Sequence, residues 1–176
     1  MLVDRLMSFA STPHKLLQQI SIMRLNWDFL PYVLISIAMP AKDIYHDAVK
    51  NALIKDGWMI TADPYLIRYK DVDLFADLAA EKPIAAEREG KKIVVEVKSF
   101  LSPSPMRDFE LALGQYIVYR NLIKLTAAEY SLYLAIKESI YQNFFLRDSI
   151  QDLLRIDSIK LLIVNTMQEE ILQWID

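Results

Sequence analysis

The segment KKIVVEVKSF, residues 91–100, limits the possible folds of this chain more than any other stretch. Its β-branched residues predict a strand. Because side chains two apart on a strand share a face, Glu96 and Lys98 project to the same side of an otherwise apolar strand. Burying charges costs several kcal/mol unless they are paired or bind a metal ion. The fold must therefore accommodate or use both charges.

The surrounding pattern predicts an α/β domain with a mixed β-sheet flanked by helices. Residues 43–55 and 106–125 show helical periodicity, and a hairpin that turns at Glu89-Gly90 is expected between them. Strands alternate with helices after residue 130. In the first helix, the apolar residues that define the expected buried face are Ile44, Ala48, Ala52 and Leu53.

Composition excludes several classes of site. The chain has no cysteine, which rules out disulfides, thiolate metal sites and a cysteine nucleophile, and fits a cytoplasmic location. Three glycines cannot build a Gly-rich phosphate loop, and two histidines cannot build a multi-histidine metal site. The net charge is −3, so contact with DNA would need a local basic patch. The residues that could form such a patch near the expected hairpin are Lys82, Arg88, Lys91 and Lys92.

The first 38 residues differ from the rest of the chain. Phe29–Met39 is apolar, but it is about half the ~20 residues that a membrane span needs, so no membrane association is predicted. Met39 opens the segment MPAKDIYHDAVKNAL, which looks like a self-contained beginning. We therefore predict an N-terminal extension over residues 1–38 and a domain over residues 39–176. The alternative is an additional helix or strand packed on the domain.

Three interpretations of Glu96 and Lys98 remain open on the residues alone. The two charges could form a modest pair on a partly exposed strand, worth ~0–1 kcal/mol. They could border a small-molecule pocket. They could also belong to a metal-dependent nuclease, in which carboxylates hold Mg²⁺ and a neighbouring lysine stabilises negative charge during attack on a phosphate.

The expected hairpin adds further acids to this face. A two-residue turn at Glu89-Gly90 would place Pro83 opposite Glu96 and Glu81 opposite Lys98. Asp77 would share the face farther along the strand, and it would need a bulge or bend to reach Glu96.

Acids that converge in this way repel one another. The repulsion is expected to raise the pKa of at least one carboxyl group. Asp77, Glu81 and Glu96 are therefore the candidate metal ligands, with Mg²⁺ or Mn²⁺ as the ion.

These residues resemble the PD-(D/E)XK nuclease superfamily. Asp77 precedes Glu96-Val97-Lys98, and the helix containing ALGQYIVYR follows. In that superfamily, a glutamine and a tyrosine on the following helix often lie against the site, and Gln115 and Tyr119 match them here. The resemblance therefore implies that Gln115 belongs to the catalytic site, whereas the alternative from the residues alone is a satisfied, semi-buried amide.

The chain departs from the superfamily pattern at two positions. Pro83 stands where the superfamily commonly carries its aspartate, so Asp77 or Glu81 must supply that acid. His46 stands where relatives often carry a helix glutamate. We expect His46 to lie on the helix surface, although a histidine could also assist Mn²⁺ binding or proton transfer.

Several separated segments also resemble the XisH family, the fdxN element excision controlling factor proteins of cyanobacteria. They are MPAKDIYHDAVKNALIKDGW, DLAAEKPIAAEREGKKIVVEVKSF, ALGQYIVYR and LYLAI. The resemblance implies a restriction-endonuclease-like fold and a role in programmed DNA excision. It further implies a site-specific recombinase and an XisI-like protein as partners. A homo-oligomer is left open.

Two functional hypotheses follow. In the first, a DNA-processing protein has a Mg²⁺-dependent phosphodiesterase site, in which Glu96 and Asp77 or Glu81 hold the metal ion and Lys98 stabilises charge. In the second, the chain is a non-catalytic control factor that binds DNA or a protein partner and retains the nuclease fold.

Overall fold

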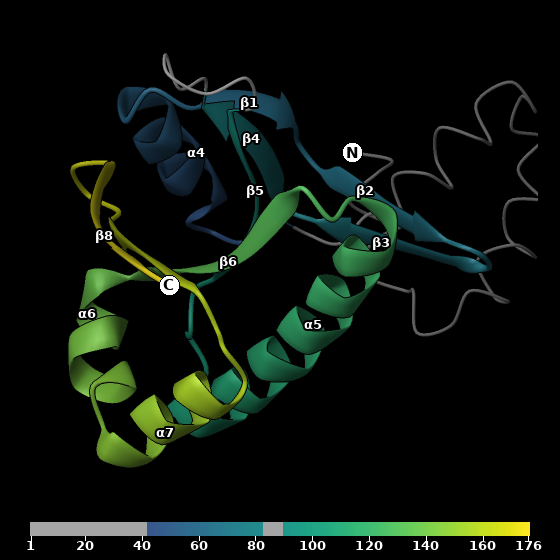
Figure 1. Ribbon diagram of the computed structural model, residues 1–176. Helices are drawn as coiled ribbons and strands as arrows, with labels where there is room; N and C mark the ends of the chain where they lie inside the picture. Colours follow the sequence, from purple (N-terminus) through teal and green to yellow (C-terminus); the bar gives the residue numbers. More distant parts are fainter. Residues whose placement is uncertain (1–41, 83–89) are drawn as a thin grey trace, which may run out of the picture. The chain divides into compact units, whose positions relative to one another are not determined.

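The computed structural model describes residues 42–82 and 90–176 (Figure 1). The predicted extension over residues 1–38 lies outside the described residues. The same holds for Met39 and for three residues of the expected hairpin, Pro83, Arg88 and Glu89. Within the described ranges, no helix is long and apolar enough to cross a membrane.

A six-stranded mixed sheet forms the centre of the domain, with strand order β1-β4-β5-β6-β7-β8. The strands β5, β6 and β7 run parallel, and the other neighbours in the sheet pair antiparallel. The predicted mixed sheet flanked by helices is thus confirmed. The bounds of its strands are β1 Met59–Ala62, β4 Leu78–Lys82, β5 Lys91–Lys98, β6 Tyr130–Lys137, β7 Leu161–Asn165 and β8 Glu170–Ile175.

A separate two-stranded antiparallel ribbon is formed by β2, Tyr65–Tyr69, and β3, Val72–Ala76. A turn at Lys70-Asp71 joins its strands, and Lys70 has a positive φ of 53°. The ribbon packs against the core through the buried residues Ile67 and Ala76. It also leads the chain directly into Asp77 and β4.

Helix α4, His46–Lys55, covers one face of the sheet. Its side chains Val49 and Leu53 pack with Val95 and Val97 of β5. Gly57 follows the helix with a φ of 85°, a conformation that glycine adopts without steric cost. Figure 1 shows α4 on the opposite side of the sheet from α5.

Helix α5, Pro105–Thr126, covers the other face. Its start is fixed by Ser104, whose hydroxyl accepts the Arg107 N–H, and by Pro105 in the first turn. Its buried side chains Phe109 and Tyr116 pack in one cluster with Val94. Neighbouring residues of β5 therefore support two separate cores, one on each face.

The connection from β6 to β7 is helical and interrupted. It consists of α6, Glu138–Ile140, a π-helical turn over Tyr141–Phe145, and α7, Asp148–Ile156. Phe144 and Phe145 of the π-helical turn pack on Phe109 of α5.

The predicted register of β4 against β5 was wrong. Lys82 pairs with Lys91, Glu81 with Lys92 and Leu78 with Val95. A two-residue turn at Glu89-Gly90 therefore does not close the hairpin, because all the residues between Lys82 and Lys91 join the two strands. With this register, Asp77 reaches Glu96 without the bulge that the sequence-based model required.

Candidate functional site

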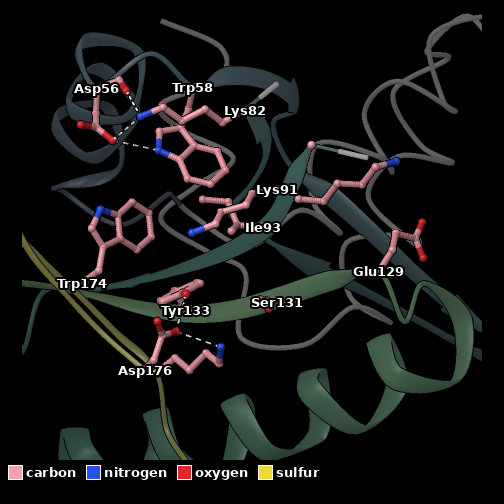
Figure 2. A pocket seen from close by; sticks show the side chains of 13 residues that line it. Asp56, Trp58, Lys82, Lys91, Ile93, Glu129, Ser131, Tyr133, Trp174 and Asp176 are labelled. Atoms are coloured by element: carbon pink, nitrogen blue, oxygen red, sulfur yellow. Dashed lines mark hydrogen bonds and ion pairs between the residues drawn. The ribbon is translucent and has the colours of Figure 1, made fainter. Parts of the chain in front are cut away.

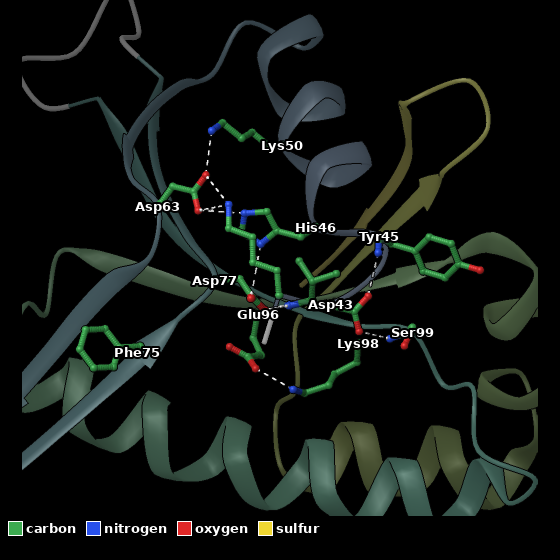
Figure 3. Close-up of polar contacts among 12 residues, drawn as sticks. Asp43, Tyr45, His46, Lys50, Asp63, Phe75, Asp77, Glu96, Lys98 and Ser99 are labelled. Carbon is green, nitrogen blue, oxygen red and sulfur yellow. Dashed lines mark hydrogen bonds and ion pairs between the residues drawn. The ribbon is translucent and has the colours of Figure 1, made fainter. Parts of the chain in front are cut away.

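Asp77 and Glu96 lie next to each other at one end of the sheet (Figure 3). The last pair of the ladder is Leu78 with Val95, so the next step along both strands brings Asp77 beside Glu96. The Oδ2 atom of Asp77 accepts the N–H of Val97 at 2.7 Å. This hydrogen bond fixes the Asp77 carboxylate to β5 just before β4 begins.

Lys98 and Glu96 form an ion pair on the α5 face of β5. The distance from Lys98 Nζ to Glu96 Oε1 is 2.8 Å. The Lys98 side chain is 31% exposed, whereas the Glu96 side chain is 4% exposed. Among the described residues, the buried Oε2 atom of Glu96 has no hydrogen-bond partner. The site therefore contains an unused acceptor oxygen beside a lysine that solvent can reach.

The protonation of Glu96 is shifted toward neutral pH. Burial is the main cause, and the charge of Asp77 adds to it, so that the pKa of Glu96 rises to about 7 although Lys98 acts in the opposite direction. The direction agrees with the expectation from neighbouring acids. The larger cause is the loss of solvent around Glu96 and not the repulsion between carboxylates.

His46 is buried, and the prediction that it lies on the helix surface was wrong. Only 2% of the residue is exposed. Its Nδ1 atom lies 3.4 Å from Asp77 Oδ1, and its Nε2 atom lies 2.9 Å from Asp63 Oδ1. His46 thus connects the first turn of α4 to the acidic site.

Asp63 receives further hydrogen bonds from lysines at the start of the domain. Lys50 Nζ donates to Asp63 Oδ2 at 2.7 Å, and Lys42 also pairs with this carboxylate. Burial acts to raise the pKa of Asp63, but the hydrogen bonds from Lys50 and Lys42 and the charge of His46 together lower it to about 2. Asp63 therefore stays ionised and holds His46 in position.

A second contact fixes the start of α4 to the end of β5. Asp43 Oδ2 accepts the N–H of Ser99 at 2.8 Å, and Asp43 Oδ1 accepts the N–H of Tyr45 at 2.9 Å. The start of α4 is thus held beside the carboxylates by two contacts, that of Asp43 with the end of β5 and that of His46 with Asp77.

Glu81 is not brought to Asp77 and Glu96. Its Oε1 atom lies 3.4 Å from Lys92 Nζ and accepts the hydroxyl of Tyr130 at 3.0 Å. Four residues separate Glu81 from Asp77 along the chain, which is ~13 Å at strand geometry. The wrong hairpin register is the reason that sequence analysis grouped Glu81 with Glu96.

Gln115 and Tyr119 form a hydrogen-bonded chain on α5. Gln115 Nε2 donates to the Tyr119 hydroxyl at 2.7 Å, and that hydroxyl donates to the Phe75 carbonyl at 2.8 Å. Burial raises the pKa of Tyr119, and the charges of Glu96 and Asp77 add to the rise. The Tyr119 hydroxyl therefore lies within electrostatic reach of the site, and the Gln115 amide is satisfied through it.

Removing the Tyr119 hydroxyl is expected to cost about 1 kcal/mol of unfolding free energy. Tyr119→Phe loses the hydrogen bond to Phe75 and leaves the Gln115 amide without its acceptor. Chemical denaturation measures the effect. Tyr141→Phe is the matched control, because Tyr141 is also partly buried against the same core, and its hydroxyl makes no hydrogen bond within the described residues. Equal losses in both variants would contradict a specific role for the Tyr119 hydroxyl.

Of the lysines predicted to form a basic patch, Lys82 and Lys91 are cross-strand partners and share one face of the sheet. Strand alternation places Lys91 and Lys92 on opposite sides of β5. Lys92 pairs with Glu81, and Lys82 pairs with Asp56. Arg88 lies outside the described residues.

Asp77 and Glu96 provide two neighbouring carboxylates that a divalent ion could use. In residues 42–82 and 90–176, no group of three or more histidine, aspartate or glutamate side chains is arranged to hold a metal ion. However, Mg²⁺ keeps several waters and is commonly bound through only one or two carboxylates. The unpartnered Oε2 of Glu96 beside Asp77 fits an ion of that partly hydrated kind.

The fold and the site define a mixed α/β protein with two carboxylates and a lysine at one end of its sheet. The chain belongs to the XisH family, because the family model described as XisH protein matches residues 39–172. No curated protein matches the chain.

Two solved structures are similar to this chain. One is an XisH family protein from Nostoc punctiforme, with 44% sequence identity and a TM-score of 0.69 over 76% of this chain and 100% of that chain. The other is a fdxN element excision controlling factor protein from Anabaena variabilis. It has 41% identity and a TM-score of 0.69 over 77% of this chain and 100% of that chain.

Proposed function

We propose that this chain acts in the excision of a DNA element through a Mg²⁺-dependent phosphodiesterase site of the PD-(D/E)XK type. A restriction-endonuclease-like fold is part of the proposal. The name of the Anabaena variabilis relative, a fdxN element excision controlling factor protein, supports the role in excision. The observation that supports the site most strongly is the unpartnered Glu96 Oε2 beside Asp77 and Lys98.

Asp77 and Glu96 would hold the ion, with Mn²⁺ as a substitute. When bound, the ion would polarise the phosphodiester and supply a water of lowered pKa. The protein's own contribution is to hold two carboxylates at fixed positions. The Val97 N–H and His46 position Asp77, and the rigid strand β5 positions Glu96.

Lys98 would stabilise the negative charge that develops on the phosphate. Its ammonium group has three donors, and the ion pair with Glu96 occupies one of them. The side chain is partly exposed, so a phosphate oxygen can reach the remaining donors. Stabilising charge at the reacting group is commonly the largest single contribution to catalysis.

A specific observation favours the second hypothesis, a non-catalytic control factor. Both oxygens of Asp77 already face protein partners, namely the Val97 N–H and the His46 ring. Glu96 Oε1 is likewise paired with Lys98. A carboxylate cluster that is largely satisfied within the protein can serve a structural role alone.

The partners in this proposal are DNA, an XisI-like protein and a site-specific recombinase, and the compartment is the cytoplasm. The net charge of −3 gives DNA no long-range attraction. Contact with DNA would therefore depend on individual lysines such as Lys98.

Millimolar Mg²⁺ or Mn²⁺ is expected to raise the melting temperature of the full chain at neutral pH. An ion at a hundredfold excess over its Kd stabilises the folded state by about 2.7 kcal/mol. Glu96→Gln should lose this stabilisation and any metal-dependent cleavage of plasmid DNA. Glu81→Gln is the matched control and should keep both, because Glu81 lies apart from Asp77 and Glu96.

The same measurements separate the two hypotheses. A melting temperature that no divalent ion shifts, together with the absence of cleavage, would reject the metal site and leave the non-catalytic control factor. Stabilisation without cleavage would support ion binding but reject the phosphodiesterase.

A further inference from the structure

A second candidate site lies on the α4 face of the sheet, at the opposite end of β5 from Glu96. It is a pocket of about 760 Å³ (Figure 2). Ile93 of β5, Tyr133 of β6 and Trp58 belong to the core that α4 covers, and all three line the pocket. Its volume lies within the range of small-molecule sites, roughly 300–1,000 Å³.

Aromatic rings form one wall of the pocket. The ring of Trp174 lies 5.5 Å from that of Trp58 and 4.9 Å from that of Tyr133, measured between centroids. Trp58 and Tyr133 are buried, whereas Trp174 is half-buried. Trp174 therefore has ring surface left over for a planar ligand.

Two lysines lie beside the aromatic wall, and each of them forms an ion pair with an aspartate. Lys82 lies over the Trp58 ring and pairs with Asp56 at 3.2 Å. Lys160 lies over the Tyr133 ring and pairs with Asp176 at 2.9 Å. These contacts hold the two ammonium groups at the border of the pocket.

Lys91 is the cation available to a ligand. It lines the pocket on the same face as Ile93, and its side chain is exposed. Within the part of the chain that the structure describes, no acidic group lies at ion-pair distance from Lys91. Asp176 and Glu129 also line the pocket, and the charge of Lys91 acts on Asp176, but an anion could approach Lys91 without breaking an ion pair of its ammonium group.

We propose that this pocket binds a nucleotide, with the base against Trp174 and the phosphate beside Lys91. A nucleotide joins a planar ring to an anion in one molecule, which matches the two unused features of the pocket. Stacking on aromatic side chains tolerates any base, because every base has a π-face. An acidic peptide would satisfy Lys91 but would leave the Trp174 ring without a planar partner.

This site goes beyond the proposed phosphodiesterase and does not depend on it. It lies on the other face of the sheet and involves none of Asp77, Glu96 and Lys98. The nucleotide has two sources, a free mononucleotide or one residue of a single-stranded DNA. The same ring and phosphate would be recognised in either case.

Titration of the full chain tests the proposal without divalent metal. A Trp27→Phe background leaves Trp58 and Trp174 as the only tryptophans. Deoxyadenosine monophosphate and a short oligodeoxyadenylate are the probes, followed by tryptophan fluorescence and calorimetry. Two further probes each lack one group: deoxyadenosine lacks the phosphate, and 2-deoxyribose 5-phosphate lacks the base. We expect saturable quenching with the first two and at least about tenfold weaker binding of the last two.

Two adjacent lysines give a matched pair of variants. Lys91→Met should weaken nucleotide binding about tenfold, because it removes a charge-assisted hydrogen bond. Lys92→Met should change binding less than about twofold, because Lys92 also lines the pocket but its ammonium group is already paired with Glu81. Melting temperatures of both variants establish that they are folded.

The titrations distinguish the two nucleotide sources and can also reject the site. Binding of the mononucleotide supports a free nucleotide as ligand, and binding of the oligonucleotide alone supports a residue of single-stranded DNA. No saturable binding of either probe would overturn the proposal. Equal losses in Lys91→Met and Lys92→Met, or equal affinity for 2-deoxyribose 5-phosphate, would also overturn it, since the pocket would then recognise only charge.

Discussion

At pH 8, Glu96→Gln is expected to raise the free energy of unfolding by about 3 kcal/mol, although it deletes an ion pair. The pKa of Glu96 is about 7 in the folded protein and near 4.5 in the unfolded chain. The folded state therefore binds a proton that the unfolded state releases, and wild-type stability falls as the pH rises from about 4.5 to about 7. Each unit of pKa shift corresponds to about 1.36 kcal/mol.

Denaturation between pH 4.5 and 8 measures this difference. Wild type and Glu96→Gln should be similar in stability at the acidic end, where Glu96 is protonated and resembles glutamine in shape. The variant should gain steadily up to about pH 7 and then stay level. Glu81→Gln is the control and should show no such gain, because Glu81 is partly exposed and its carboxylate pairs with Lys92. A Glu96→Gln protein that is less stable than wild type at pH 8 would mean that the pair with Lys98 outweighs the cost of burying Glu96.

His46→Ala is expected to lower the free energy of unfolding by about 3 kcal/mol. The substitution removes a buried ring and leaves a cavity between α4 and the sheet. It also takes away the ring nitrogens that face Asp77 and Asp63, and groups left without partners cost about 1–3 kcal/mol. Chemical denaturation at neutral pH gives the magnitude.

Lys50→Ala is the matched control for His46→Ala. Lys50 also contacts Asp63, but its side chain is 34% exposed, so a loss below about 1 kcal/mol is expected. His46→Gln should recover part of the loss, because an amide fills some of the cavity and can donate to one carboxylate. If the two alanine variants lost equal stability, His46 would have no special role in joining α4 to Asp77.

The elements with strong periodicity could be predicted from the sequence. The apolar run of residues 91–100 contains β5, and the helical pattern over 106–125 contains almost all of α5, Pro105–Thr126. In each case the local pattern and the packing against the sheet agree. The convergence of Glu96 and Lys98 follows from strand geometry alone, so it too could be predicted.

The register of β4 could not be predicted, because it depends on how many residues join two strands. Glu89-Gly90 has the composition of a tight turn, but the ladder pairs Lys82 with Lys91. This one difference moves Asp77 to Glu96 and takes Glu81 away from it. The pairing energy of the strands decides between such registers, and turn composition carries little information about it.

The burial of His46 could have been predicted from its spacing to apolar residues on α4, but the buried face of the helix was assigned wrongly. His46 lies three residues before Val49 and seven before Leu53, which are both buried, so it shares their stripe on α4. The predicted face included Ile44, which precedes α4 and is 65% exposed. The nucleotide pocket had no comparable signal, because Trp174, Lys91 and Lys160 come from distant parts of the chain.

The two faces of β5 pack into two different cores, and this limits how the sequences of this family can change. Even-numbered residues from Lys92 to Lys98 face α5, and odd-numbered residues from Lys91 to Val97 face α4. Inserting or deleting one residue before Glu96 would send both its carboxylate and the Lys98 ammonium group into the α4 core, and it would turn Val97 toward α5. We therefore expect related chains to vary along β5 by substitution while its length stays fixed, and length variation to gather in the connection that precedes it.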